Sequence, residues 1–264
     1  MPQANSRPQT SPAAPRVMIT AAASGIGLQT ALDFVQDGAQ VFVCDADPAA
    51  LQRTLAQHGA LSGMLCDVSD EAQVAALFAR GVQVLGGLDV LVNCAGIAGP
   101  TASVAEMAFA DWRQCLSVNL DGTFLCCREA ARIMGAQGSG AIVNLSSTAG
   151  LYGFPRRAPY ASAKWALRGL TKTLAQELGP RGVRVNCVCP GSEEGDRMDR
   201  VIAAEAAKTG QTEAAVRTLF TQTASLRTFV SAQDISSTIR FLASRQGARI
   251  SGQEIVVDGN TETL

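Results

Sequence analysis

Seven short apolar runs alternate with segments of helical apolar spacing along the 264 residues, and this alternation constrains the fold most. Strand, helix and next strand in succession is the pattern of parallel strands joined by crossover helices that cover both faces of a sheet. We therefore predict an α/β fold: one Rossmann-type doubly wound domain with a mainly parallel seven-stranded sheet and helices on both faces. The expected strands are 17–19, 41–44, 61–65, 90–92, 141–145, 183–188 and 254–257.

The first expected strand runs into a turn that contains two glycines, Thr20-Ala-Ala-Ala-Ser24-Gly25-Ile26-Gly27, and a helical pattern follows. Free backbone N–H groups at the start of such a helix attract a pyrophosphate. The second strand ends at Asp45, 20 positions beyond Gly25. A carboxylate there accepts hydrogen bonds from an adenosine ribose and repels a 2′-phosphate. The combination predicts NAD rather than NADP as the cofactor.

A tyrosine and a lysine four positions apart, Tyr160 and Lys164, are expected on one face of a helix. An ammonium group beside a phenol lowers the phenol pKa, which is about 10 when unperturbed. Thirteen positions before the tyrosine, Ser147 ends an apolar run, and its hydroxyl could bind a carbonyl oxygen. Such a pair alone is common and also fits a half-buried tyrosine with a solvated lysine. Together with the glycine turn, the pattern indicates a tyrosine that transfers a proton, a lysine that lowers its pKa and a serine that binds the substrate oxygen.

From about Arg16 to about Gly259 the chain resembles the short-chain dehydrogenase/reductase family, beginning with its TGxxxGxG turn at 20–27. The resemblance implies hydride transfer between a nicotinamide and a carbonyl or alcohol carbon. It implies that the catalytic residues are Asn119, Ser147, Tyr160 and Lys164. It implies that the cofactor-binding residues are Thr20, Ser24, Gly25, Ile26, Gly27, Asp45, Asp67, Val68, Asn93, Ala95, Gly96, Tyr160, Lys164, Pro190 and Gly191.

The resemblance also assigns roles to the catalytic residues. Ser147 donates a hydrogen bond to the substrate oxygen, and Tyr160 gives a proton to that oxygen in reduction or removes one in oxidation. Lys164 lowers the tyrosine pKa and bonds the nicotinamide ribose. Asn119 positions a water that links Lys164 to solvent; the alternative is a polar residue near a helix N-terminus that bonds only the backbone.

The sequence departs from the family at two places. Ala21 replaces the first glycine of the turn and is strained if that position needs a positive φ. After Pro190-Gly191 the family usually has an apolar residue and then a threonine that helps bind the nicotinamide carboxamide. Here Glu193 and Gly195 occupy those positions, within Ser192-Glu-Glu-Gly-Asp196. We expect these acidic side chains to point to water in a mobile lid.

The segment 192–229 is longer than an ordinary connection and carries apolar residues at roughly helical spacing. We predict that it is a substrate lid within the catalytic domain 16–264; plain surface helices are the alternative. The expected pocket residues also include Ile97 and Leu151, and the expected substrate contacts are Ser147, Ala149, Tyr152, Phe154 and Tyr160. This mostly apolar set favours a secondary alcohol or ketone with an apolar or cyclic body. Arg156 and Arg157 could meet an anionic substrate, although a solvated or subunit-facing position is favoured.

Composition argues against several classes of function. A net charge of −1 gives no reason to expect nucleic acid or an anionic membrane as a partner. No apolar run reaches the length of about 18 residues that indicates a membrane span. The eight cysteines mostly lie in apolar runs without paired metal-ligand spacing, so we expect buried free thiols, no metal and a cytoplasmic location. Residues 1–15 read as a disordered lead.

Three other functions stay open. A weakly active or non-catalytic NAD-binding sensor or scaffold is compatible with Ala21 and the acidic stretch. A 3-oxoacyl thioester reductase is possible, but those relatives usually take NADPH, which Asp45 disfavours. An epimerase or dehydratase is a further possibility, although such relatives are usually longer.

The resemblance also implies a homotetramer, or a dimer, that pairs helices at about 119–135 and 158–179.

Overall fold

The computed structural model describes residues 14–261, without the side chains of 196, 197, 204 and 208. Most of the expected disordered lead lies outside the described residues. The described chain contains a seven-stranded sheet in the order β3-β2-β1-β4-β5-β6-β7, and every pairing is parallel. The predicted fold class is confirmed. The strands are β1 (Arg16–Thr20), β2 (Gln40–Asp45), β3 (Leu61–Leu65), β4 (Val90–Asn93), β5 (Gly140–Leu145), β6 (Val183–Pro190) and β7 (Glu254–Val257).

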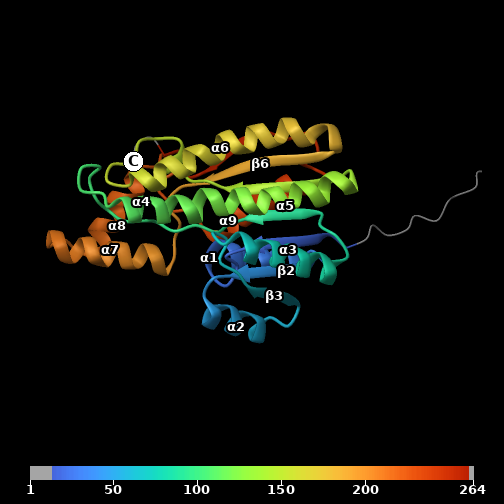
Figure 1. Cartoon of the computed structure of the whole chain (residues 1–264). Coiled ribbons are helices and arrows are strands. Elements are labelled where there is room, and N and C mark those ends of the chain that lie inside the picture. Colours follow the sequence, from blue (N-terminus) through green and yellow to red (C-terminus); the bar gives the residue numbers. More distant parts are fainter. Residues whose placement is uncertain (1–13, 262–264) are drawn as a thin grey trace, which may run out of the picture.

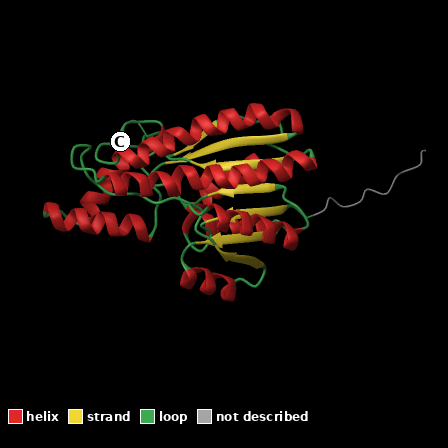
Figure 2. Cartoon of the chain, viewed as in Figure 1, coloured by secondary structure: helices red, strands yellow, loops and turns green. Residues whose placement is uncertain are grey.

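Helices connect the strands and lie on both faces of the sheet (Figures 1 and 2). They are α1 (Gly25–Gln36), α2 (Pro48–Gln57), α3 (Glu71–Leu85), α4 (Phe109–Leu116), α5 (Gly122–Gln137), α6 (Ala158–Leu178), α7 (Asp196–Thr209), α8 (Glu213–Gln222) and α9 (Ala232–Ala243). A π-helical turn, η1 (Ser117–Asp121), joins α4 to α5, and two 3-10 turns, η2 (Thr148–Gly150) and η3 (Gly179–Arg181), flank α6. No helix in residues 14–261 is long and apolar enough to cross a membrane.

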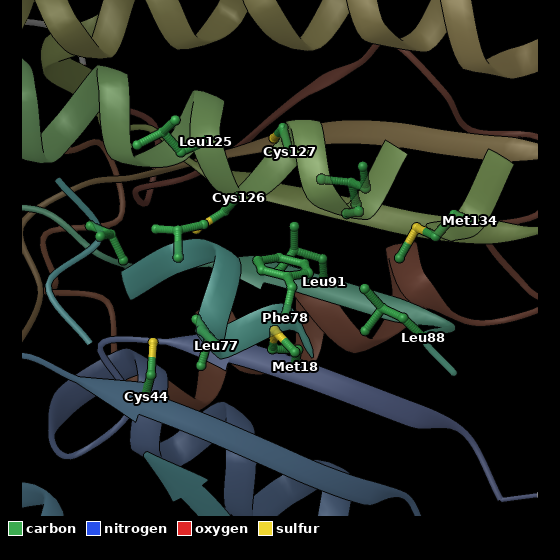
Figure 3. Packing of buried hydrophobic residues seen from close by; sticks show 14 of the residues in the cluster. Met18, Cys44, Leu77, Phe78, Leu88, Leu91, Leu125, Cys126, Cys127 and Met134 are labelled. Carbon is green, nitrogen blue, oxygen red and sulfur yellow. The ribbon is translucent and has the colours of Figure 1, made fainter. Parts of the chain in front are cut away.

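Two separate apolar clusters pack against the sheet, one on each face. On one face Leu77 and Phe78 of α3 and Leu125 of α5 pack against strand residues such as Met18 (Figure 3). On the other face α1 and α9 cover the sheet, with Phe34, Ile235, Ile239 and Leu242 among the buried side chains. Because both faces are covered, the strands read as near-continuous apolar runs.

The strand order reverses between β1 and β4, because the chain first adds β2 and β3 on one side and then returns to the other. In open α/β sheets, ligands bind beyond the carboxyl ends of the strands at this reversal. Helices α7 and α8 project beyond that same edge (Figure 1). The fold therefore places the predicted glycine turn, the tyrosine–lysine pair and the segment 192–229 around one edge of the sheet.

Candidate active site

The turn between β1 and α1 leaves the start of a helix open to a ligand. Ser24 precedes α1 with extended backbone and makes no side-chain cap bond, and both Ser24 and Gly25 are exposed. Gly27 must be glycine, since a Cβ there would lie 2.2 Å from the carbonyl oxygen of Ala21. The backbone N–H groups at the start of this twelve-residue helix therefore face the crevice, in the arrangement that binds a pyrophosphate.

Ala21 adopts a φ of +50°, so the position does require the left-handed region that favours glycine. The backbone stays in this conformation because Ala22 donates its N–H to the carbonyl oxygen of Cys44 (3.0 Å). An alanine in this region costs about 1–2 kcal/mol relative to its preferred conformation. The turn is present and carries strain that a glycine would remove.

Asp45 ends β2 with its carboxylate against the glycine turn. One oxygen accepts the N–H of Ala23 (3.0 Å) and the other accepts the N–H of Asp47 (3.0 Å). These two bonds fix the carboxylate close to the open N-terminus of α1, which begins two residues after Ala23. Its charge lies where the ribose of a bound dinucleotide would follow the pyrophosphate.

Asp67 and Val68 follow β3 at the same edge and differ in exposure. Asp67 is exposed, and its carboxylate accepts hydrogen bonds from the backbone and hydroxyl of Ser69 (2.9 and 2.7 Å). Val68 is 5% exposed and belongs to the apolar core, where it occupies the space beside Gly122. Only the backbone of Val68 is left for a cofactor, whereas the Asp67 side chain lies on the surface of the crevice.

Two predicted cofactor residues are bonded within the protein instead of facing the crevice. The Thr20 hydroxyl accepts the N–H groups of Cys94 and Ala95 (both 3.1 Å) and so joins the end of β1 to the segment after β4. The Asn93 amide is buried and donates to Asn144 (2.9 Å) in the neighbouring strand. These bonds shape the edge on which Ala95 and the exposed Gly96 present their backbone.

The three predicted chemical groups lie on adjacent elements at the carboxyl end of β5. Ser147 precedes η2, and its hydroxyl oxygen accepts the N–H of Ala149 (3.1 Å), which leaves the hydroxyl proton to donate elsewhere. Tyr160 and Lys164 lie one turn apart in the first half of α6. The Lys164 ammonium is 5.5 Å from the centre of the Tyr160 ring.

Lys164 is 4% exposed and donates one proton to the carbonyl oxygen of Leu145 (2.9 Å). The backbone carbonyl of Lys164 accepts the hydroxyl of Ser146 (2.8 Å), which fixes α6 against the end of β5. An ammonium group has three protons, so two are left for the crevice. The arrangement places a buried positive charge next to the phenol.

Asn119 lies in the π-helical turn η1 and is fully buried. Its amide nitrogen donates to the carbonyl oxygens of Ile97 (2.9 Å) and Cys115 (2.8 Å), whereas its Oδ1 has no protein partner. A Cβ on Gly96 would be 2.6 Å from that oxygen and 3.3 Å from Lys164 Nζ, so both atoms flank the same glycine. The alternative role, hydrogen bonding to the backbone alone, explains the two bonds that the amide nitrogen makes. It does not explain why the buried Oδ1 has no protein partner.

The segment after β6 is tied to the sheet rather than loose. Pro190 ends β6, and Gly191 packs so closely on Asp258 that a Cβ would be 2.6 Å from its Cβ. The exposed carboxylate of Glu194 pairs with Arg217 of α8 (3.3 Å). Glu193 is partly exposed, and the side chain of Asp196 lies outside the described residues, so the expectation that these acids point to water stays a prediction.

The predicted substrate contacts divide by exposure. Phe154 is exposed, whereas Ala149 is 1% exposed and can offer little more than backbone. The Tyr152 ring is exposed, but its hydroxyl donates to the carbonyl oxygen of Thr261 (3.1 Å). Tyr152 therefore contributes a ring surface and not a polar contact.

The guanidinium of Arg157 is partly used in bonds within the protein, through Nη1. It donates to the carbonyl oxygens of Ala98 (3.0 Å) and Gly99 (3.2 Å), and it lies 5.9 Å from the centre of the Phe154 ring. It fastens two crevice loops together, a role that the sequence pattern did not indicate. Arg156 is exposed.

Helices α7 and α8 share a small apolar core of their own around Ile202, Ala206 and Val216.

All eight cysteines are free, and all are buried except the partly buried Cys94. In the described part of the chain, no cluster of three His, Cys, Asp or Glu side chains has an arrangement suited to a metal ion.

Comparison with known proteins agrees with this architecture. Residues 20–260 match the family model described as enoyl-(acyl carrier protein) reductase. A 3β-hydroxysteroid dehydrogenase of Mediterraneibacter gnavus is 34% identical over 262 residues, covering 94% of each chain. NAD⁺-bound xylitol dehydrogenase is similar with a TM-score of 0.86 at 28% identity, covering 92% of this chain and 97% of that one. An actinorhodin polyketide ketoreductase variant with NADPH has a TM-score of 0.88 at 31% identity, with 93% and 96% covered.

The chain belongs to the short-chain dehydrogenase/reductase family, as the sequence motifs indicated. Its class of activity is oxidoreduction between alcohols and ketones, at CH–OH groups, with a nicotinamide cofactor. One of the two similar structures contains NAD⁺ and the other NADPH, so the choice of dinucleotide depends on this chain's own residues.

Proposed function

We propose that the protein is an NAD-dependent oxidoreductase that interconverts a secondary alcohol and its ketone. The observation that carries the choice of NAD is the Asp45 carboxylate, bonded to the N–H of Ala23 beside the open start of α1. A ribose hydroxyl gains an acceptor at that point, whereas a 2′-phosphate meets a negative charge. We assign the remaining predicted cofactor residues to the same site, where Val68 can offer no more than backbone and the Thr20 and Asn93 side chains support it through bonds within the protein.

The nicotinamide supplies hydride chemistry, and the protein supplies orientation and proton handling. Ser147 donates its hydroxyl proton to the substrate oxygen, while its own oxygen is fixed by the N–H of Ala149. Tyr160 gives a proton to that oxygen in ketone reduction and, as phenolate, removes it in alcohol oxidation. The Lys164 ammonium, 5.5 Å from the centre of the Tyr160 ring, offers its remaining protons to the nicotinamide ribose.

The tyrosine proton must be exchanged with solvent after each turnover. Asn119 Oδ1 and Lys164 Nζ flank Gly96, and the first is a buried acceptor without a protein partner. A water between them would satisfy that acceptor and connect the lysine to the outside. We therefore assign to Asn119 the positioning of this proton path.

The surroundings of Ser147 and Tyr160 favour a substrate with an apolar or cyclic body. Phe154 and Tyr152 expose aromatic rings near the crevice, and the Arg157 guanidinium is already bonded to two carbonyl oxygens. We propose that the segment 192–229, with α7 and α8, covers the bound substrate as a lid. The steroid named for the Mediterraneibacter gnavus relative is a cyclic apolar body of the kind we propose.

We also propose that the protein is a homo-oligomer, with a tetramer favoured. Helices α5 and α6 form a groove lined by Phe124, Arg128, Leu170 and Leu174. Phe124 of α5 and Trp165 of α6 are about half exposed. Large exposed aromatic side chains are typical of subunit contacts.

The eight free cysteines fit the reducing cytoplasm, where we place the protein.

The test is the oxidation of a panel of cyclic secondary alcohols with either NAD⁺ or NADP⁺. The rate is measured from the formation of NADH or NADPH. We expect turnover with NAD⁺ to exceed turnover with NADP⁺ for every alcohol that reacts. A preference for NADP⁺ would contradict the proposal and favour the 3-oxoacyl thioester alternative. Binding of NADH without hydride transfer to or from any alcohol or ketone would favour the non-catalytic alternative.

A further inference from the structure

Arg157 joins two loops that border the crevice. It directly precedes α6, which carries Tyr160 and Lys164 in its first half. Its Nη1 donates to the carbonyl oxygens of Ala98 (3.0 Å) and Gly99 (3.2 Å), in the loop that follows β4. One side chain therefore fixes the loop after β4 against the start of α6.

A second hydrogen bond joins the same two loops. The N–H of Ala102 donates to the carbonyl oxygen of Arg156 (3.1 Å). Arg156 has a φ of +65° and Gly99 has a φ of +64°, both in the left-handed region. A residue other than glycine keeps such a conformation only where its surroundings hold it there. The two loops therefore form one fixed unit.

The loop that Arg157 holds also carries a bond to Asn119. The amide nitrogen of Asn119 donates to the carbonyl oxygen of Ile97 (2.9 Å), one residue before the carbonyl groups that Arg157 binds. The same nitrogen donates to the carbonyl oxygen of Cys115 (2.8 Å), four positions earlier in the chain. Since an amide nitrogen has two protons, these two carbonyl groups fix the plane of the amide. The direction of Asn119 Oδ1 depends on both.

Both ends of the segment 96–99 pack closely on residues of the site. A Cβ on Gly96 would lie 2.6 Å from Asn119 Oδ1 and 3.3 Å from Lys164 Nζ. A Cβ on Gly99 would lie 2.8 Å from Cys115 Sγ. A shift of this segment would therefore disturb the space between the Asn119 oxygen and the lysine ammonium.

We propose that Arg157 is a positioning residue for proton transfer. Its two bonds hold the segment 96–99, and the carbonyl group of Ile97 passes this constraint to the Asn119 amide. The inference rests on the proposed function, because it requires the proton path between Asn119 and Lys164. Arg157 acts on the reaction through the loop, so its loss lowers kcat more than it weakens binding of the alcohol or the cofactor.

The experiment compares kcat, KM and the dissociation constant of NADH, with an alcohol that the wild-type protein oxidises. Arg157→Met removes both hydrogen bonds and keeps a long side chain, whereas Arg157→Ala removes them with a small one. Arg156→Met is the matched control, because it removes the neighbouring positive charge from an exposed residue. Asn119→Ala, alone and combined with Arg157→Met, tests whether the two residues act as one unit.

We expect kcat to fall by about tenfold in both variants at 157, while KM and the dissociation constant of NADH stay close to wild type. The loss is smaller than the roughly 10²-fold cost of a full displacement, because Asn119 keeps its bond to Cys115. The control should keep the wild-type kcat. The double variant should lose no more activity than Asn119→Ala alone, because the arginine acts through the asparagine.

An unchanged kcat in both variants at 157 overturns this inference and leaves the proposed function intact. An equal fall of kcat in Arg156→Met also overturns it, because the charge and not the two bonds would then be responsible. Losses that multiply in the double variant overturn it as well, since Arg157 would then act on another group. A wild-type protein that oxidises no alcohol overturns the proposed function and this inference together.

Discussion

The Lys164 ammonium lies 5.5 Å from the centre of the Tyr160 ring and donates to the carbonyl oxygen of Leu145 (2.9 Å). The carbonyl group at the end of β5 thus holds a buried cation beside the first half of α6. The pair therefore places a buried cation next to the ring of the proposed acid–base group.

Replacement of Tyr160 by phenylalanine removes the proton donor and keeps the ring. We expect kcat/KM to fall by about 10²–10⁴-fold, the usual contribution of general acid–base catalysis. The dissociation constant of NADH should stay close to wild type, as measured by titration of the same preparation. Tyr152→Phe is the matched control, because Tyr152 is the other of the chain's two tyrosines and its hydroxyl bonds Thr261. Equal losses in the two variants would contradict the assignment.

Gly96→Ala tests the proposed proton path between Asn119 and Lys164. The added Cβ would meet Asn119 Oδ1 at 2.6 Å and Lys164 Nζ at 3.3 Å, so both groups must shift. We expect kcat to fall by about 10²-fold, since displacements of this size disturb catalytic geometry strongly. Gly153→Ala serves as the control, because a Cβ there meets no atom within 4 Å. Unaltered kcat in Gly96→Ala would rule out a functional role for this contact.

Asp45→Asn tests the basis of cofactor choice. The amide keeps an oxygen to accept the N–H of Ala23 but loses the charge that repels a 2′-phosphate. NADPH binding should strengthen by about tenfold, and NADH binding should weaken slightly. Asp47→Asn removes a charge two positions away, where the carboxylate caps α2. If Asp47→Asn strengthens NADPH binding relative to NADH binding as much as Asp45→Asn does, the general negative potential of the region sets the choice of dinucleotide, and Asp45 does not.

Ala21→Gly should stabilise the protein, which is the reverse of the usual effect of glycine. The φ of Ala21 is +50°, and glycine adopts this region without the strain that alanine has there. After the entropic cost of a glycine in the unfolded chain, we expect a gain of about 0.5–1 kcal/mol in the free energy of unfolding. Thermal melts should show a small rise in Tm for Ala21→Gly. They should show a fall for Ala39→Gly, the control, because Ala39 does not have a positive φ and glycine there only adds entropy to the unfolded chain. A lower Tm in Ala21→Gly would show that the turn is not strained.

The sequence predicted the fold well, because apolar runs with little interruption mark buried parallel strands. The expected run 17–19 lies within β1 (Arg16–Thr20), and the run 254–257 coincides with β7 (Glu254–Val257). The glycine spacing also predicted the open start of α1. Each of these features depends on residues close together in the chain, so local patterns suffice.

Contacts between distant residues could not be predicted in this way. The Thr20 hydroxyl bonds N–H groups more than 70 positions away, and Arg157 bonds carbonyl oxygens more than 50 positions away. Sequence periodicity places a residue on a face of an element but does not reveal its partner. The same limit applies to Glu193, whose place beside the ends of β5 and β6 depends on a bridge to Val230.

The most direct measurement is an equilibrium titration of the wild-type protein with NADH and, separately, with NADPH. The account predicts saturable binding of NADH that is at least about tenfold tighter than that of NADPH, because Asp45 favours a ribose hydroxyl and repels a phosphate. Binding of NADPH with equal or higher affinity, or binding of neither, would contradict the account.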